Sequence, residues 1–252
     1  MILIENPAAR LLAILEKGKS IPPEQTCHSA WNNLLDTHAA PNTFLPRLAK
    51  VMELPNQTVE LLDLLDTSDR QKNVNKYWIN QVNAGFINQS VNSSWATFIN
   101  HIDDHTIDYL VMTSELLDAK SNINANTPTQ ALSDIKQTLQ NLLNDTLEND
   151  ELDKEIKRYL VRSLQRVIVA IDEHFISGYT PIVEAIETTI GYMVLDSKTD
   201  DKKVYSAFYD TGIAKEFFNA LGIISTLVTL ATGVPLIAND LYQALLPILK
   251  SE

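Results

Sequence analysis

The sequence predicts an all-α fold, a multi-helix bundle that ends in an apolar helical hairpin. Apolar residues recur along most of the chain at the three- and four-residue spacing of amphipathic helices. Only 7 of the 252 residues are glycine, fewer than a fold with many tight turns needs. The 10 prolines stand mainly between apolar runs, where proline begins or ends helices.

Residues 1–120 are predicted to form an N-terminal helical bundle. In the first helix, Asn6 is the expected N-cap and Pro7 occupies the first helical position. Helical spacing persists through the Asn-rich stretch 71–100, which argues against a disordered polar tract. Further helices are expected at residues 24–35, in NTFLPRLAKVMELP up to Pro55, in NQTVELLDLLD, and from Ser93 to Ala119.

Residues 127–195 are predicted to form a three-helix unit. Thr127 and Pro128 combine an N-cap with a first-turn proline, and they open its first helix. The apolar pattern restarts at Asn149 and keeps a 3.6-residue period over about 25 residues. Gly178 is a natural C-terminal cap before the third helix, because glycine adopts left-handed backbone angles easily.

Residues 196–252 are predicted to contain a charged hinge followed by two apolar helices. No charged side chain occurs from Phe217 to Asn239, and a helix of that length would cross the roughly 30 Å hydrocarbon core of a bilayer. Gly233 and Pro235 interrupt the run, and a second apolar piece follows from Leu241 to Leu249. The two pieces form either a hairpin that enters lipid or one that stays buried in a soluble bundle.

One side of the apolar run carries small and hydroxyl side chains. Such a stripe lets helices approach closely in a membrane, and it permits equally tight packing inside a soluble bundle. In an oligomer it could pack neighbouring copies or line a wet path. This small-residue stripe consists of Asn219, Gly222, Ser225, Thr226, Thr229 and Gly233.

The overall charge and the cysteine content restrict the class of protein. A net charge of −12 opposes contact with nucleic acid phosphates, so we expect no nucleic-acid partner. The single cysteine, Cys27, excludes an internal disulfide and a cysteine-rich zinc site. The N-terminal stretch MILIENPAAR lacks the basic region of a secretory signal. These observations favour a cytoplasmic protein, associated with the inner membrane if its tail inserts.

The segment HIDDHTID is the only candidate metal site. On a continuous helix, His101 and His105 would lie one turn apart with Asp108 nearby, which resembles a two-histidine, one-carboxylate ligand set. That helix would direct the three side chains to its flank and solvent face, and no second motif supplies further ligands. We therefore expect no metal and no other cofactor.

Four basic residues, spaced four positions apart, lie along the long helix predicted after Asn149. Such a row could bind anionic lipid, a nucleotide or an acidic partner. The favoured interpretation is a solvated face that Glu151 and Glu155 partly neutralise. This basic row consists of Lys154, Arg158, Arg162 and Arg166.

The functional hypothesis follows from the apolar tail, because no nucleophile elbow, phosphate loop or dinucleotide fingerprint supports an enzyme. The leading hypothesis is a cytosolic, bacterial-type helical protein whose hydrophobic C-terminal helix inserts into membrane after a trigger. That design suits a membrane-perturbing toxin or a cell-death effector of phage defence, acting as a homo-oligomer. The alternative is a soluble scaffold or adaptor whose tail completes its core or binds a partner helix.

Overall fold

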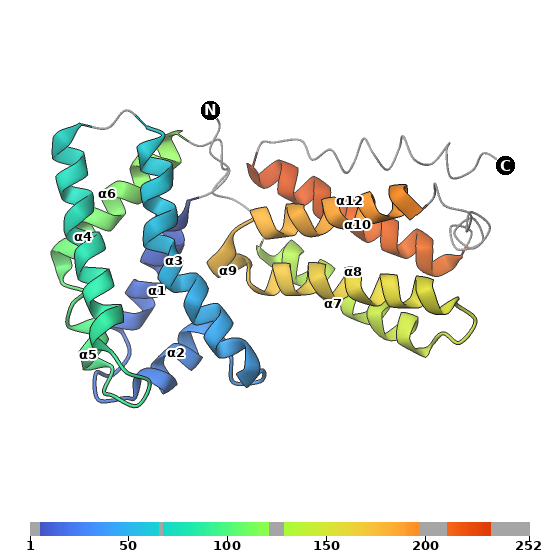
Figure 1. Cartoon of the computed structure of the whole chain (residues 1–252), viewed down its shortest axis with the longest axis horizontal. Helices are drawn as coiled ribbons and strands as arrows, with labels where there is room; N and C mark the ends of the chain where they lie inside the picture. The colour runs from blue at the N-terminus through green and yellow to red at the C-terminus, as the bar shows by residue number, and fades with distance from the viewer. Residues whose placement is uncertain (1–5, 66–67, 121–128, 197–210, 233–252) are drawn as a thin grey trace. The chain divides into compact units, whose positions relative to one another are not determined.

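The computed structural model describes residues 6–65, 68–120, 129–196 and 211–232 (Figure 1). Within these ranges every named element is a helix, which confirms the all-α fold and its apolar C-terminal helix. The chain divides into two compact units. Unit 1 comprises Met1–Asn122 and Phe175–Gly178, and unit 2 comprises Ile123–His174 and Tyr179–Glu252.

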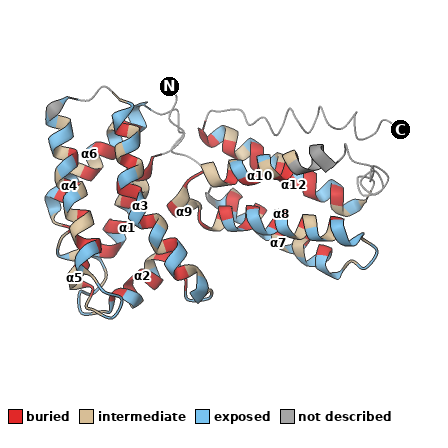
Figure 2. Cartoon of the chain, viewed as in Figure 1, coloured by how far each residue is buried: buried red, intermediate tan, exposed pale blue. Residues whose placement is uncertain are grey.

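Unit 1 is a bundle in which α1 packs against α3 and α6, and α4 packs against α6. Its inner faces are buried, as the red residues along these helices show in Figure 2. The elements are α1 (Pro7–Lys19), α2 (Cys27–Leu35), η1 (Pro41–Thr43), α3 (Phe44–Asp63), α4 (Asp69–Asn88), α5 (Ala96–Ile99), α6 (Asp104–Lys120) and most of α9 (His174–Ser177).

The predicted start of α1 is confirmed. The side-chain oxygen of Asn6 accepts a hydrogen bond from the N–H of Ala9 at 2.9 Å, and Pro7 occupies the first helical turn. The same side chain donates to the carbonyl of Ser114 at 3.0 Å and to Asp118 at 2.6 Å. One capping residue therefore satisfies a helix end and also fastens α1 to α6.

The predicted break at Pro55 is wrong, because α3 runs unbroken from Phe44 to Asp63. Proline inside a helix removes the N–H that would bond to the carbonyl of Val51, at a cost of about 3 kcal/mol. Val51, Leu54 and Leu62 lie on one face of α3 and are buried in the core. Each buried side chain of this size stabilises the fold by about 1.5–3 kcal/mol, so the packed face outweighs the lost bond.

The predicted helix from Ser93 to Ala119 is also wrong, since the structure divides it into α5 and α6. Asp103 ends the connection between them, and its side chain accepts a hydrogen bond from the N–H of Thr106 at 2.7 Å. That is the geometry of an N-cap. Asp104 then places a negative charge in the first turn of α6, where the helix dipole favours it.

Aromatic side chains fill the centre of unit 1. An isolated β-bridge between Thr26 and Ser94 holds the segment before α5 against the start of α2. This contact places the ring of Trp95 edge-on to that of Trp31, with the ring centroids 5.0 Å apart. Gly85 lies so close to this cluster that an added Cβ would come within 3.0 Å of the Phe98 ring.

The described part of unit 2 is a bundle of four helices, α7 (Thr129–Glu148), α8 (Lys154–Asp172), α10 (Thr180–Asp196) and α12 (Gly212–Thr232). The packed pairs are α7 with α8, α7 with α12, α8 with α10 and α10 with α12 (Figure 1). These pairs close a ring, so α8 and α12 lie diagonally opposite each other. The apolar tail helix therefore shares one core with the middle helices.

Local capping sets the ends of the helices around α8. The expected restart at Asn149 is a turn, in which its side-chain oxygen accepts from the N–H groups of Glu151 and Leu152 at 2.8 and 3.1 Å. Asp153 is the actual N-cap of α8. Gly178 follows α9 with φ of 71°, the left-handed conformation predicted for a cap. Four predicted features lie outside the described residues: the helix start at Thr127 and Pro128, the charged hinge, the interruption at Gly233, and the second apolar piece, Leu241 to Leu249.

Candidate functional site

Among the described residues, α12 is the helix that is long and apolar enough to cross a bilayer. Its 21 residues give a length of about 31 Å at 1.5 Å per residue, close to the roughly 30 Å of a hydrocarbon core. In its most apolar 18-residue window, 44% is buried within the protein. The helix therefore has two sides that lie in different surroundings.

The buried side of α12 completes the core of unit 2. Phe217, Ile224 and Val228 are each 0% exposed, and they belong to the same cluster as Leu160 and Leu164 of α8. Apolar side chains are stable in a protein core and in lipid alike, but their exposure to water is unfavourable. The bundle must therefore open before these side chains can meet a membrane.

Most of the small-residue stripe lies on the outer side of α12. A Cβ built on Gly222 would meet nothing within 4 Å, so the described part of the chain holds no close-packed partner there. The hydroxyl of Thr226 donates back to the Gly222 carbonyl at 2.9 Å. Asn219 and Thr226 are exposed, Gly222 and Thr229 are half-buried, Ser225 is buried, and Gly233 lies outside the described residues.

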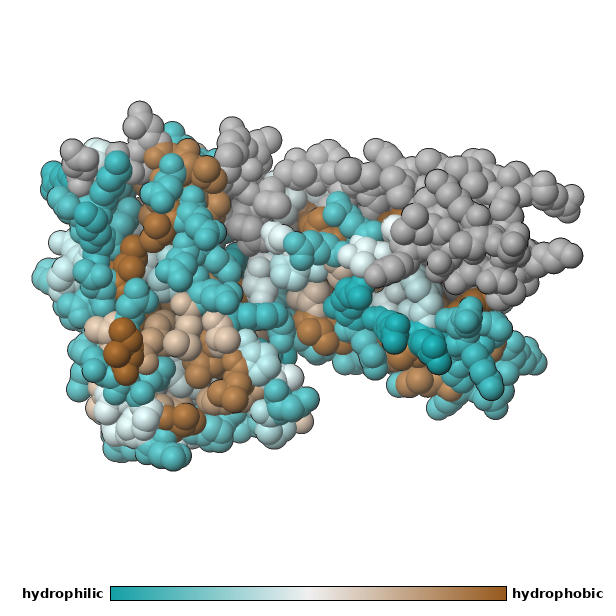
Figure 3. Space-filling model, in the orientation of Figure 1, coloured by the Kyte–Doolittle hydropathy of each residue, from teal (hydrophilic) through white to brown (hydrophobic). Residues whose placement is uncertain are grey.

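The basic row occupies the outer face of α8. Figure 3 shows a line of strongly hydrophilic side chains across this helix. Each member of the row stands two positions before a buried core residue, about 160° away around the helix. All four members, Lys154, Arg158, Arg162 and Arg166, are exposed, and the four core residues are Ile156, Leu160, Leu164 and Ile168.

The acidic residues near the basic row form no described ion pairs with it. Within the described residues, no ion pair joins the row to Glu151 or Glu155. Lys157, on the flank of α8, donates to the Asn149 carbonyl at 3.0 Å and lies 4.0 Å from Asp150. The helix thus carries five basic and two acidic side chains within a chain of net charge −12.

The two histidines of the candidate metal site lie in different settings. His101 is in the turn before α6, where its ring nitrogen is 3.3 Å from the amide of Asn88. His105 is exposed on α6 and stacks against Tyr109. The continuous helix that would set His101 and His105 one turn apart, with Asp108 nearby, does not form. Across the described residues, no three His, Cys, Asp or Glu side chains come together as a ligand set.

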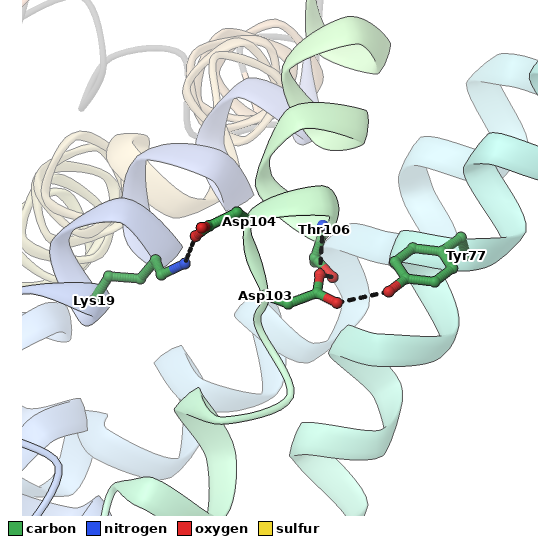
Figure 4. Close-up of polar contacts among 5 residues, drawn as sticks. All are labelled: Lys19, Tyr77, Asp103, Asp104 and Thr106. Atoms are coloured by element: carbon green, nitrogen blue, oxygen red, sulfur yellow. Dashed lines mark hydrogen bonds and ion pairs between the residues drawn. The ribbon is translucent and has the colours of Figure 1, made fainter.

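The same segment forms a hydrogen-bonded network at the first turn of α6 (Figure 4). One carboxylate oxygen of Asp103 accepts from the Tyr77 hydroxyl at 2.6 Å. Its other oxygen accepts from both the N–H and the hydroxyl of Thr106, each at 2.7 Å. Beside it, Lys19 donates to Asp104 at 2.7 Å. These bonds tie α4 and α1 to α6.

The charges of this network are held in place, because each bond favours the form already present near neutral pH. The hydrogen bond from Tyr77, followed by those from Thr106, holds the pKa of Asp103 below its usual value. The same bond to Asp103 raises the pKa of the Tyr77 phenol. The Lys19 ammonium lowers the pKa of Asp104. The pKa shifts of Asp103, Asp104 and Tyr77 all point away from neutral pH, which does not suit proton exchange, so we assign the network a structural role.

Sequence reasoning did not identify Tyr77 or the capping role of Asp103. A signal for the cap is present, since Asp103 precedes an acidic first-turn residue and stands three positions before Thr106. Nothing local links Tyr77 to it, because Tyr77 lies in α4 and Asp103 lies in the connection before α6. The chain matches no protein-family model, and neither curated proteins nor solved structures give a significant match.

Proposed function

We propose that this protein holds a membrane-inserting helix, α12, inside the bundle of unit 2 until a trigger releases it. The observation that carries the proposal is the helix itself, whose 21 residues reach bilayer length and which, after Lys215 and Glu216 in its first turns, carries no charge from Phe217 to its end at Thr232. Three helices with polar outer faces, α7, α8 and α10, accompany it in one bundle. Such a bundle keeps an apolar helix soluble in water.

The energetics favour a triggered release. Moving Phe217, Ile224 and Val228 from a protein core into lipid changes their apolar surroundings little. The cost arises from the core faces of α7, α8 and α10, which lose their packing when α12 leaves. These helices are amphipathic and can lie in a membrane interface, which would recover part of that loss. Insertion is thus coupled to opening of the whole bundle.

A membrane-perturbing toxin or a cell-death effector of phage defence is the biological role we propose for this activity. The outward position of Gly222 and Thr226 supports it, since among the described residues no side chain packs closely against Gly222. In a bilayer the small-residue stripe would let copies of α12 approach closely. A growth assay with a membrane-potential dye tests the role, and unchanged growth and potential on expression of inserting protein would contradict it.

A charge placed on the outer side of α12 tests insertion without disturbing the core. Thr226 is exposed and lies near the middle of the uncharged run, so Thr226→Lys leaves the soluble fold intact. In lipid, a lysine at the helix centre costs about 2.5–3.5 kcal/mol, or roughly 100-fold in insertion. Asn219→Lys is the matched control, because residue 219 is near the end of the run, where a lysine can reach the interface.

The experiment uses the full chain with Leu164→Ala, which weakens the bundle from α8 by about 2–5 kcal/mol and stands in for the trigger. Carbonate-resistant association with lipid vesicles is measured. We expect Leu164→Ala to increase it, Thr226→Lys to abolish the increase, and Asn219→Lys to retain it. Equal association of the two lysine variants, or none with Leu164→Ala, would contradict insertion.

A second candidate function is a soluble scaffold in which α12 is a permanent core helix. The complete burial of Phe217, Ile224 and Val228 favours it, because a core helix of a soluble bundle shows the same pattern. Cell fractionation separates the two functions. Recovery of the Leu164→Ala chain only in the soluble fraction supports the scaffold, and recovery in the membrane fraction supports the inserting helix.

A further inference from the structure

The basic row is a concentration of positive charge that forms no ion pair with the described carboxylates. Lys154, Arg158, Arg162 and Arg166 project from the outer face of α8, and no described carboxylate forms an ion pair with them. The surrounding chain is strongly acidic, with a net charge of −12. A row of this sign on such a protein attracts an anionic surface locally, although the whole molecule repels it.

The shape of the row fits a flat partner. From Lys154 to Arg166 it extends about 18 Å along α8, and it winds by about 120° around the helix axis because each four-residue step adds about 40°. The helix surface is convex there, since the core lies on the opposite side. Three of the four side chains are arginine, whose planar guanidinium groups bind phosphate oxygens in pairs. A convex row of guanidinium groups can reach many headgroups of a planar bilayer at once.

An exposed apolar side chain continues the row. Val169 follows Arg166 by three positions, on nearly the same side of α8, and it is 51% exposed. A row of carboxylates or of nucleic acid phosphates alone offers such a side chain no apolar surroundings. A membrane surface offers phosphate groups to the arginines and, just beneath the phosphates, acyl chains to the valine.

We propose that the basic row of α8 is a docking surface for anionic lipid headgroups. The inference deepens the proposed function and rests on it for the choice of a membrane as the partner. Because α8 and α12 lie diagonally across the bundle, a molecule docked through the row directs α12 away from the lipid. Docking is therefore a reversible, charge-driven step, distinct from the insertion of α12.

Replacement of the three arginines tests the docking step. The combined variant Arg158→Gln, Arg162→Gln and Arg166→Gln removes three charges from exposed positions and keeps good helix formers in α8. Binding of the full chain is measured by flotation with vesicles of 70% phosphatidylcholine and 30% phosphatidylglycerol. We expect affinity to fall on the order of 100-fold, since each basic residue near such a surface contributes about fivefold.

A matched control changes the same net charge elsewhere. Arg70, Lys72 and Lys76 are exposed basic residues of α4 in unit 1, and their combined replacement by Gln should leave vesicle binding unchanged. Binding of the unaltered chain should weaken as salt rises and disappear with pure phosphatidylcholine. Equal losses in the two triple variants, binding to neutral vesicles, or binding to polyglutamate but not to anionic vesicles would overturn the assignment.

The docking step and the insertion step fail in different ways. Thr226→Lys should retain row-dependent binding to anionic vesicles, because residue 226 faces outward from α12 and not from α8. If no variant inserts but the arginine variant still loses vesicle binding, docking stands and only the proposed function fails. If insertion proceeds equally with and without the three arginines and without any prior binding, the docking surface is overturned.

Discussion

The replacement Phe217→Ala measures how far α12 supports unit 2. The Phe217 side chain is 0% exposed and belongs to the core cluster shared by the four helices. Removal of a buried phenyl ring costs about 3–5 kcal/mol of unfolding free energy, from lost burial and from the cavity left behind. Ile223, which is 44% exposed on the same helix, provides the control, since Ile223→Ala should cost less than about 1 kcal/mol.

The tryptophans make the assay specific to one unit. All three of them, Trp31, Trp78 and Trp95, lie in unit 1, so their emission reports on that unit alone. Circular dichroism at 222 nm reports on the helices of both units. In urea titrations of the full chain, Phe217→Ala should lower the midpoint of a helical transition by roughly 1.5–2.5 M, for a slope of about 2 kcal/mol/M. The tryptophan transition should move less.

A milder variant keeps the measurement informative if the alanine variant does not fold. Phe217→Leu retains a large apolar side chain, and it should lower stability by about 1 kcal/mol. The reasoning would be refuted if Phe217→Ala shifted the dichroism midpoint no more than Ile223→Ala. That result would mean that α12 contributes little to the bundle, contrary to its buried face.

Three further outcomes follow from the structure. Gly85→Ala should destabilise the protein by about 1–3 kcal/mol, because its Cβ would come within 3.0 Å of the Phe98 ring. Gly222→Ala should stabilise the protein by up to about 1 kcal/mol, because its Cβ would meet no described atom within 4 Å and alanine favours helix. Thermal melts compare the two variants, and a Gly222→Ala protein less stable than Gly85→Ala would contradict the packing. Asp103→Ala should lower the free energy of unfolding by about 0.5–2 kcal/mol, because the N–H of Thr106 loses its cap. Urea titration measures this change, and unchanged stability would contradict the capping role of Asp103. Because the pKa of Asp103 is lowered on folding, its charge stabilises the protein fully above the ordinary pKa of about 4 and loses that effect as the pH falls through the folded value. The stability difference between the unaltered protein and Asp103→Asn should therefore shrink in acid, and a difference that grew would reverse the sign of the shift.

The helical character of the chain and several helix ends could be read from local patterns. Asn6 and Pro7 mark the start of α1 because a cap and a first-turn proline satisfy the backbone wherever the helix packs. Gly178 marks an end for the same local reason. Where the deciding interaction is tertiary, local patterns mislead. Pro55 stays inside α3 because its neighbours are buried in a core that the sequence does not display.

Non-local contacts also determine what became of the candidate sites. The turn between α5 and α6 depends on Asp103, whose partner Tyr77 comes from another helix, so the two histidines separate. The basic row was predictable from its four-residue spacing, but the absence of ion pairs between the row and the described carboxylates was not. On α12, Ile223 is exposed and Ile224 is buried although their chemistry is identical. Only packing against α7 and α10 decides which side faces outward.

The entry of α12 into lipid can be measured directly with a label on its outer side. In a Cys27→Ser background with Leu164→Ala, Ile223→Cys carries an environment-sensitive fluorophore, and Ser133→Cys on the exposed face of α7 carries the same label as a control. We expect anionic vesicles to shift the emission at residue 223 to the blue, and lipids with nitroxides deep in their acyl chains to quench it, while the label at residue 133 responds less. Vesicle-bound protein whose label at residue 223 remains in water would contradict the central claim.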